Sequence, residues 1–365
     1  MDMPSVSISF SEVAATAIER GDRGIIAMIL KDTVYKNQAI EVLTVNDIPK
    51  TMTTANKTQI KLAMMGYQNT PKKVVAYILD ATAEEVDYSD ALDYFAVNKF
   101  NYLVIPTVYT DQKTTDIVTW IKQQRDNGKK VKAILPNTPA DCEGIINYTT
   151  ERVSDGSNDY TTEEYCSRIA GIIAGTPLRI SCTFAPLNEL TDCSKLKKED
   201  MDKAVGNGEF IVWWDGEKVK TGRAVTSFKT TTSEKGDKFK KIKIVEAIDM
   251  IYEDIKKTAE DSYIGKYENS YDNKGLLISA IMGYFEKLKT DKILGAYSVG
   301  IDVEENRTYL LSKGSKVKID GGTEKKLEDC SDDDIKKADT GDKVYLKASI
   351  AIYDTIEEIK LPIAI

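Results

Sequence analysis

Between residues 74 and 174 the sequence alternates short apolar runs with amphipathic stretches, and this alternation restricts the possible folds more than any other feature of the chain. Such a pattern is typical of strand–helix–strand units, in which crossover helices make neighbouring strands parallel. Four runs rich in β-branched residues are expected to be strands: residues 74–79, 102–105, 131–135 and 145–148. The sequence therefore predicts an α/β domain with a mostly parallel central sheet, from about residue 24 to about residue 187.

Three helices are expected within this domain because apolar residues recur there at intervals of three and four. The third helix has the clearest ends, since Thr161 and Glu164 have the spacing of a capping box and Gly175 precedes Thr-Pro. The residues expected on the apolar faces are Leu92, Phe95 and Ala96 in the first helix, Ile117, Trp120 and Ile121 in the second, and Tyr165, Ile169, Ile172 and Ile173 in the third.

The second half of the chain changes to charged connections, a hairpin and long helices, which indicates a separate α+β domain. Asp215 and Gly216 are expected to form the hairpin turn, because Asp-Gly suits a turn that requires positive φ. Apolar residues at helical spacing predict one helix around residues 244–255 and another around residues 277–288. Residues 314–343 are dense in Lys, Asp and Gly, and are expected to form an exposed excursion with a small hairpin at its Gly-Gly pair.

Both ends of the chain have the alternation of apolar and polar residues that is typical of β-strands. Two interpretations remain open: the end segments dock as edge strands on their own domain, or they add strands to the sheet of a neighbouring subunit. The alternating apolar residues are Val6, Ile8 and Phe10 near the N-terminus, Val344, Leu346, Ile350 and Ile352 in a strand near the C-terminus, and Leu361, Ile363 and Ile365 in the last residues.

The free-energy change on ordering one end segment is close to zero, because the gain from burying its side chains and the cost of ordering its backbone are similar. Burial of three large apolar side chains stabilises by roughly 5–9 kcal/mol at most, whereas ordering about six residues costs about 6–12 kcal/mol. We therefore expect the end segments to be mobile in a free subunit, and to become ordered only when several contacts form together in an assembly.

The chain contains no histidine, which excludes a Ser-His-Asp triad, a Cys-His pair, a His-ligated zinc and a His proton shuttle. No segment has the pattern of a phosphate-binding loop, a dinucleotide-binding loop or a nucleophile elbow. The acidic clusters at residues 84–85 and 332–334 lack the ligand spacing of a calcium-binding loop and are expected to be solvated. We therefore expect no catalytic, cofactor-binding or metal-binding residues.

The charge composition argues against a nucleic-acid partner. The chain has 50 Lys and Arg residues against 58 Asp and Glu residues, a net charge of −8, and only eight of the basic residues are Arg. Five cysteines without a C-x-x-C pair favour a reducing compartment. Because the first residues lack the pattern of a signal peptide and the apolar runs are too short to cross a bilayer, we expect a protein made in the cytoplasm without a membrane partner.

Several segments carry a family resemblance. They are PSVSISF at residues 4–10, RGIIA at residues 23–27, AGIIAGTPL at residues 170–178, VEAID at residues 245–249, YIGK at residues 263–266 and the closing strands at residues 343–365. Together they resemble the contractile tail sheath proteins of phages, defective prophages and phage-tail-like R-type bacteriocins of Gram-positive bacteria. The chain differs from larger members of that family in being compact and in having the charged excursion.

The resemblance implies a structural protein whose subunits stack as rings around a tail tube. It implies an N-terminal arm at residues 1–20, an outer α/β domain at residues 21–190, an inner α+β domain at residues 191–353 and a C-terminal strand arm at residues 354–365. In the family, the arms insert as strands into the sheets of adjacent subunits. The resemblance thus makes Val6, Ile8 and Phe10 one inserted strand, Leu361, Ile363 and Ile365 the other, and Val344, Leu346, Ile350 and Ile352 part of the receiving sheet.

The resemblance also implies how the protein works and what it binds. Contraction is driven by the relaxation of an extended lattice, so no nucleotide or other cofactor is expected. The expected partners are other copies of the chain, the tail tube protein, and baseplate and tail terminator proteins, with assembly in the bacterial cytoplasm before release in a particle. Lys287, Lys289 and Lys292 are candidates for polar contact with the tube. An α/β enzyme of unknown chemistry and a non-contractile, strand-exchanging shell or adaptor protein remain as alternatives.

Overall fold

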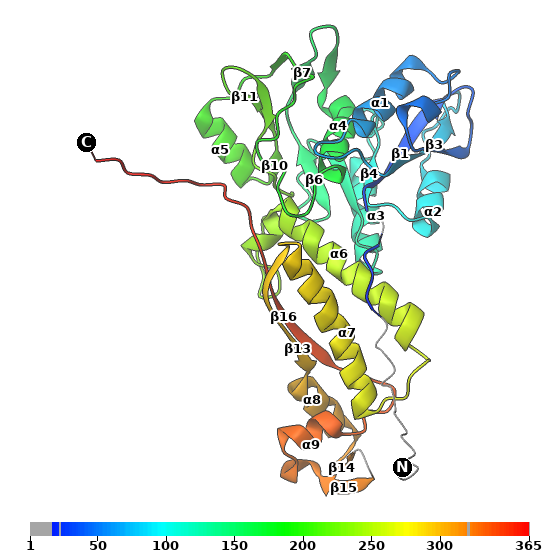
Figure 1. The fold of residues 1–365 in the computed structure, drawn as a ribbon. Helices are drawn as coiled ribbons and strands as arrows, with labels where there is room; N and C mark the ends of the chain where they lie inside the picture. Colours follow the sequence, from blue (N-terminus) through cyan, green and yellow to red (C-terminus); the bar gives the residue numbers. More distant parts are fainter. Residues whose placement is uncertain (1–16, 22, 320–321, 365) are drawn as a thin grey trace, which may run out of the picture. The chain divides into compact units, whose positions relative to one another are not determined.

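The computed structural model describes residues 17–21, 23–319 and 322–364 (Figure 1). These residues form two compact units, which are described separately. The α/β unit comprises Gly21–Glu253 and Asp354–Ile365, and the C-terminal unit comprises Met1–Arg20 and Asp254–Tyr353, in each case without the residues outside the described ranges.

A seven-stranded sheet forms the centre of the α/β unit, in the order β10-β6-β5-β4-β1-β3-β2. All neighbouring strands are parallel except β2, which pairs antiparallel with β3. The four strands expected from the sequence are confirmed as β3 to β6, and so is the mostly parallel sheet. The strands are β1 (Ile25–Asp32), β2 (Gln38–Val42), β3 (Lys73–Asp80), β4 (Tyr102–Val104), β5 (Lys132–Pro136), β6 (Ile145–Tyr148) and β10 (Glu209–Phe210).

Strand β1 lies near the middle of the sheet and was not among the expected strands. Its sequence, IIAMILKD, is apolar without alternation, because both faces of the strand are buried. Its side chains enter two separate cores, one on each face of the sheet: Ile26, Met28 and Leu30 lie in one core, and Ile25, Ala27 and Ile29 in the other. An apolar run of this kind cannot be told from a buried helix by periodicity.

Helices cover both faces of this sheet. The cores place α1 (Thr54–Met64) and α4 (Thr162–Ala174) on one face, and α2 (Ser89–Val97) and α3 (Thr114–Asp126) on the other. The three expected helices are confirmed as α2, α3 and α4. The capping box of α4 is also confirmed: the Thr161 backbone N–H donates to Glu164 Oε2 at 2.8 Å, and Gly175 forms the C-cap.

Helices α1 and α4 approach each other closely at Gly171. A Cβ atom added at Gly171 would lie 2.2 Å from the backbone carbonyl oxygen of Ala63, so the two helix backbones must separate to admit a side chain. We expect Gly171→Ala to lower the free energy of unfolding by roughly 1–3 kcal/mol, as overpacking does. Gly283→Ala, at an exposed helical site with open space around the new Cβ, is the matched control and should be neutral or stabilising. Urea denaturation of both variants tests this, and equal stabilities would contradict it.

The rest of the α/β unit consists of smaller elements around the sheet edge. The Asp215-Gly216 turn is confirmed, with Gly216 at φ 106° between two antiparallel strands. These elements are β7 (Arg152–Ser154), β8 (Asp159–Thr161) and β9 (Asp192–Cys193) in a three-stranded sheet, α5 (Lys198–Gly206), the hairpin strands β11 (Val212–Trp214) and β12 (Val219–Thr221), 3-10 turns at Val45–Asp47 and Asp237–Lys240, and α6 (Ile242–Thr258), which continues past residue 253.

The compact units do not coincide with the expected domains, whose boundary was placed at residue 190. Strand β10 pairs in parallel with β6 in the seven-stranded sheet, and Phe210 is buried in the same core as Tyr148. Residues 191–253 therefore pack with the α/β unit, and the boundary between units falls after Glu253. The change in composition near residue 190 reflects exposed connections at the edge of one unit.

The C-terminal unit is built on a long helix and a two-stranded sheet. Helix α7 (Tyr271–Thr290) contains the second expected helix, residues 277–288. Strand β13 (Leu294–Ile301) pairs antiparallel with β16 (Leu346–Ile352), which confirms a strand in the alternating stretch near the C-terminus. The other elements are a π-helical turn at Ala259–Tyr263, α8 (Val303–Lys313), β14 (Lys316–Ile319), β15 (Thr323–Lys326), a 3-10 turn at Leu327–Asp329 and α9 (Asp332–Lys337).

Most described residues of the segment 314–343 are exposed, as expected, but the segment is more ordered than an excursion with a single hairpin. Strands β14 and β15 form the expected hairpin, but the segment also packs with α8 around a small core of its own. The core consists of Leu310, Val317, Ile319, Leu327, Cys330, Ile335 and Ala338. These apolar residues stand singly among charged ones, and the sequence is therefore typical of a solvated stretch.

Among the described residues, no helix is long and apolar enough to cross a membrane.

Candidate functional site

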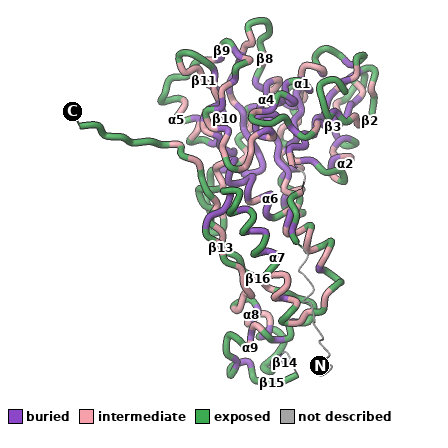
Figure 2. Tube along the Cα trace, in the orientation of Figure 1, coloured by how far each residue is buried: buried purple, intermediate pink, exposed green. Residues whose placement is uncertain are grey.

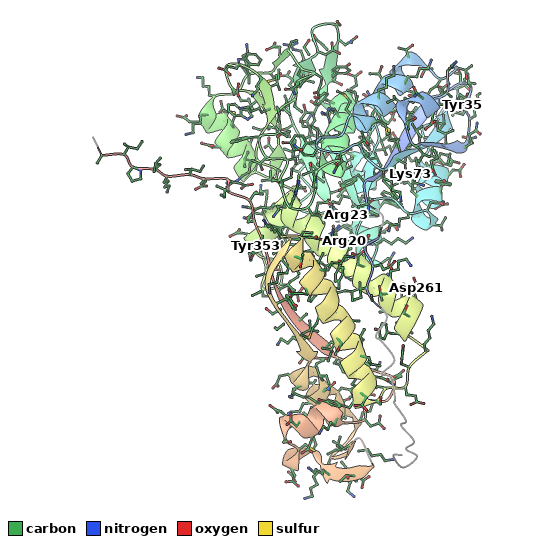
Figure 3. The ribbon with its side chains drawn as sticks, viewed as in Figure 1. Arg20, Arg23, Tyr35, Lys73, Asp261 and Tyr353 are labelled. Atoms are coloured by element: carbon green, nitrogen blue, oxygen red, sulfur yellow. The ribbon has the colours of Figure 1, made fainter. Side chains whose placement is uncertain are left out.

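The described bases of the two end segments lie at one corner of the C-terminal unit. Arg20 makes an ion pair with Asp291, which follows α7, and the Tyr353 backbone N–H donates to the Ile293 carbonyl oxygen at 2.9 Å. Ile18, just before Arg20, is buried. Figure 3 labels Arg20 and Tyr353. The described bases of both segments therefore lie beside the turn that connects α7 to β13.

From Glu358 onward, the described C-terminal segment is extended and exposed. Leu361 and Ile363, two of the three residues expected in the inserted strand, are 75% and 76% exposed. Among the described residues, 353–364 pair with no strand, so docking of this segment on its own sheet is not seen (Figure 2). The other expected arm residues, Val6, Ile8, Phe10 and Ile365, lie outside the described residues.

Strand β16 carries three of the four residues expected in a receiving sheet, Leu346, Ile350 and Ile352, while Val344 precedes the strand and is 41% exposed. Strands β13 and β16 pair only with each other among the described residues, so each has one open edge. An open edge presents unpaired N–H and C=O groups that can bind an added strand. Chemically, this sheet is suited to β-augmentation.

One side of this sheet packs on α7, where the Phe285 and Tyr297 rings lie 5.6 Å apart. A groove of about 750 Å³ lies between the first half of α7 and the end of β13. Its lining combines apolar and small residues with the charged side chains of Asp272 and Lys336; the apolar and small ones include Leu276, Ile278, Ser279, Val299, Gly300 and Ile301. A strand added beside β13 would therefore meet partly exposed apolar side chains as well as unpaired backbone groups.

The three lysines expected to face the tube lie together, at the end of α7 and in the turn after it, and all are exposed. Lys289 lies 3.7 Å from Glu286 and 5.8 Å from the centre of the Tyr297 ring. Asp291 lies between the lysines in sequence, so the patch is not uniformly positive. Lysines in the last helical turn also interact favourably with the helix dipole, which supplies a structural reason for Lys287 and Lys289.

A buried charge network in the α/β unit was not expected from the sequence. Its centre is Asp249 on α6, which accepts two parallel hydrogen bonds from Arg125 of α3, at 2.9 and 3.0 Å. Lys132 of β5 lies 2.7 Å from Asp249 and 3.0 Å from Glu246, one helical turn earlier. The side chains of Arg125, Lys132, Glu246 and Asp249 are all at most 8% exposed. This network joins α6 to the sheet and to α3.

Further groups extend the network at both ends. Arg23, labelled in Figure 3, makes an ion pair with Glu246, and the Tyr102 hydroxyl donates to Glu246 Oε2 at 2.7 Å. Glu143 accepts from Arg125 at 3.2 Å and from Lys235 at 2.8 Å. Because every carboxylate in the network has a cationic partner, the network is suited to fastening α6 rather than to proton transfer.

The electrostatic environment keeps these groups ionised. Burial acts to raise the pKa values of Glu246 and Asp249, but the neighbouring cations and hydrogen-bond donors together outweigh it, and both pKa values are lowered. Lys132 acts on both carboxylates, with Arg23 on Glu246 and Arg125 on Asp249. Burial conversely acts to lower the pKa of Lys132, and the two carboxylates raise it. The available signal was the three-residue spacing of Glu246 and Asp249, which places these two acids on one face of the helix.

The carboxyl ends of the parallel strands are where sheets of this kind usually bind ligands. Here Asp32, at the end of β1, accepts hydrogen bonds from the backbone N–H groups of Thr53 and Val34, both at 3.0 Å. Burial opposes ionisation, but these bonds hold the pKa of Asp32 at about 2. The neighbouring Lys31 pairs with Asp111 at 2.5 Å. These polar groups satisfy one another, and among the described residues no cluster of three Cys, Asp or Glu is placed to hold a metal.

Comparisons with known proteins match phage tail sheath proteins along nearly the whole chain. Residues 81–227 match the family model of the phage tail sheath protein central domain, and residues 234–365 match that of the phage tail sheath C-terminal domain. The tail sheath protein of Clostridium phage phiCD119 is 35% identical over 363 residues, 98% of each chain. The sheath tail protein of Desulfitobacterium hafniense, at 17% identity, has a similar fold with a TM-score of 0.68 over 82% of this chain and 94% of that one. The helical sheath of the anti-feeding prophage in its contracted state aligns with a TM-score of 0.69 at 13% identity, over 100% and 99%.

Proposed function

The chain belongs to the phage tail sheath protein family, and on that premise we propose that it is the structural subunit of a contractile sheath, polymerising as stacked rings around a tail tube and contracting to drive the tube through a bacterial envelope. The observation that carries this proposal is the 35% identity to a phage tail sheath protein over 98% of both chains. The similarity in fold to a helical sheath in its contracted state supports the contractile part of the proposal.

The end segments connect the subunits of this polymer. The strand of Leu361, Ile363 and Ile365 adds to the sheet of one neighbour, and the strand of Val6, Ile8 and Phe10 to the sheet of another. The receiving sheet is β13 and β16, with Val344, Leu346, Ile350 and Ile352. Two features support this assignment: the exposed apolar residues of the C-terminal segment, and the open edges of the two-stranded sheet.

Flexible end segments let subunits rotate and move outward without losing their connections. Contraction then draws on the difference in contact energy between the extended and contracted lattices, and needs no nucleotide. In the assembled sheath the α/β domain faces outward and the C-terminal domain faces the tube. The other partners are the baseplate and tail terminator proteins, with assembly in the bacterial cytoplasm and release in a phage tail or phage-tail-like particle.

Contacts between the sheath and the tube are polar, because the sheath must release the tube when it contracts. Lys287, Lys289 and Lys292 supply part of this contact. We expect the triple variant Lys287→Glu, Lys289→Glu, Lys292→Glu to weaken tube binding at least tenfold, since each reversal replaces an attraction by a repulsion. Co-sedimentation with purified tubes at two salt concentrations measures this. Binding that is insensitive to both salt and charge reversal would contradict the assignment.

Negative-stain electron microscopy of the concentrated purified protein tests the proposed function. A sheath subunit forms hollow helical tubes, alone or when tail tubes are added as a template. Closed rings that do not stack in either condition would favour a strand-exchanging adaptor protein. Monodisperse single subunits in both conditions would contradict polymerisation and would leave the α/β enzyme as the alternative.

A further inference from the structure

The base of the C-terminal segment has an unusual distribution of polar and apolar residues. The Glu357 side chain is 8% exposed, whereas the adjacent Glu358 is 72% exposed. On either side, Ile356 and Ile359 are 86% and 83% exposed. A segment in its final contact would bury the isoleucines and expose the carboxylate, because burying an ionised carboxylate is costly unless it is paired. Here the carboxylate is the group that faces the protein.

Glu357 is paired with three side chains from separate parts of the α/β unit. Its Oε2 atom accepts from Arg223 Nε at 2.8 Å and from Lys241 Nζ at 3.2 Å. Its Oε1 atom accepts from the Thr183 hydroxyl at 3.1 Å. Lys241 also lies 2.5 Å from Asp354. Charge-assisted bonds of this kind are about twice as strong as neutral ones.

The contact between the C-terminal segment and the α/β unit is confined to a few polar side chains. A hollow of about 460 Å³ remains between the segment and the 180–184 loop, lined by Ile180, Phe184, Ile356 and Ile359 among others. The apolar side chains therefore do not close over the contact, and the ionic bonds of Glu357 and Asp354 account for the attachment. Beyond Glu357, the described residues have only one further ion pair, a 3.5 Å contact between Glu358 and Arg223.

We infer that Glu357 is the pin that fastens the C-terminal arm to its own subunit, and that the surface offered to a second copy of the chain begins after it, with Ile359, Leu361 and Ile363 as the outward apolar face. The binding of that apolar face to a second copy rests on the proposed function, whereas the attachment through Glu357 does not. The pin divides residues 354–365 into a base that stays with its own subunit and a strand that is free to pair elsewhere.

Limited proteolysis of the full-length chain with proteinase K, read by intact-mass spectrometry, tests the pin. In the wild type we expect trimming to stop after Glu358. In Glu357→Gln, which keeps the shape of the side chain but removes its charge, trimming should continue into residues 354–357, with cleavage there about 10- to 100-fold faster. Arg223→Gln should have the same effect. Glu358→Gln is the matched control and should trim as the wild type does.

Each result bears on one claim. If Glu357→Gln stops at the same residue as the wild type while its thermal unfolding is unchanged, the pin is wrong. If Glu358→Gln also extends the trimming, the attachment depends on general negative charge and the assignment to Glu357 is wrong. Electron microscopy of the same variants separates the attachment through Glu357 from the pairing of the arm with a second subunit. If Glu357→Gln extends the trimming but the wild-type protein never forms polymers, the attachment is supported and the pairing with a second subunit is contradicted.

Discussion

A chain truncated after Glu358 is expected to fold normally and to lose the capacity to form tubes. The deletion removes Leu361 and Ile363, which are largely exposed and whose backbone pairs with no strand among the described residues. Their loss therefore costs the free subunit no packing, but it removes the strand that we propose to pair with β16 or β13 of a neighbour. Negative-stain microscopy and sedimentation velocity of the full-length and truncated chains, at equal concentration and with the same tube template, measure the effect.

Point substitutions separate the loss of a strand from the loss of its apolar face. Leu361→Asp with Ile363→Asp places charges on the face that a neighbouring sheet would bury, and should abolish tubes as completely as the truncation does. Lys360→Asp with Ala364→Asp changes the same number of residues on the opposite face of the strand, and should preserve assembly. Tubes of normal abundance from the truncated chain would show that the C-terminal segment is not the connection between subunits.

Asp249→Asn is expected to destabilise the α/β unit by about 3–5 kcal/mol, as does removal of one partner from other buried ion pairs. Asparagine has nearly the same shape, but it leaves Arg125 without its paired carboxylate oxygens and Lys132 with Glu246 alone. Both cations are almost fully buried, so water cannot replace the lost partner. Urea denaturation at pH 7, followed by circular dichroism and tryptophan fluorescence, measures the free energy of unfolding.

Asp116→Asn is the matched control for this change. Asp116 also lies on a helix and pairs with a lysine, Lys113 at 3.4 Å, but its side chain is 65% exposed. The control should change the stability by no more than about 0.5 kcal/mol. The double variant Arg125→Met with Asp249→Leu should lose less stability than the two single changes together, because no charge is left unpaired between these positions. An Asp249→Asn variant as stable as the control would contradict the importance of the network.

The sequence predicted best those elements that depend on local pattern. Alternation and β-branched runs located β3 to β6 and the strand β16, and the capping box located the start of α4. Strand β1 was missed because it has no alternation and because Ala27 and Met28 interrupt its β-branched residues. The compact units differ from the domains expected from the sequence, because the pairing of β10 with β6 joins segments about 60 residues apart and no local signal records such a pairing.

The features of the candidate site divide in the same way. The apolar alternation of Leu361 and Ile363 is local and predicts a strand, but it leaves open whether that strand pairs within its own domain or with a neighbouring subunit. The network around Asp249 joins residues 124 positions apart, and each of its members reads in the sequence as an ordinary surface charge. Likewise, nothing local distinguishes Glu357 from Glu358. Only the fold, which brings Thr183, Arg223 and Lys241 together, makes one of these glutamates a point of attachment.

The two-stranded sheet of β13 and β16 also affects the life of the subunit before it is assembled. Within the described part of the chain each strand has a bare edge, and such edges pair indiscriminately with other extended chains when concentrations are high. The seven-residue length of β16 and the charge of Lys347 limit this hazard but do not remove it. Ordered growth and amorphous precipitation therefore compete for the same subunits. The soluble lifetime of a newly made subunit is set by the backbone groups that later hold the polymer together.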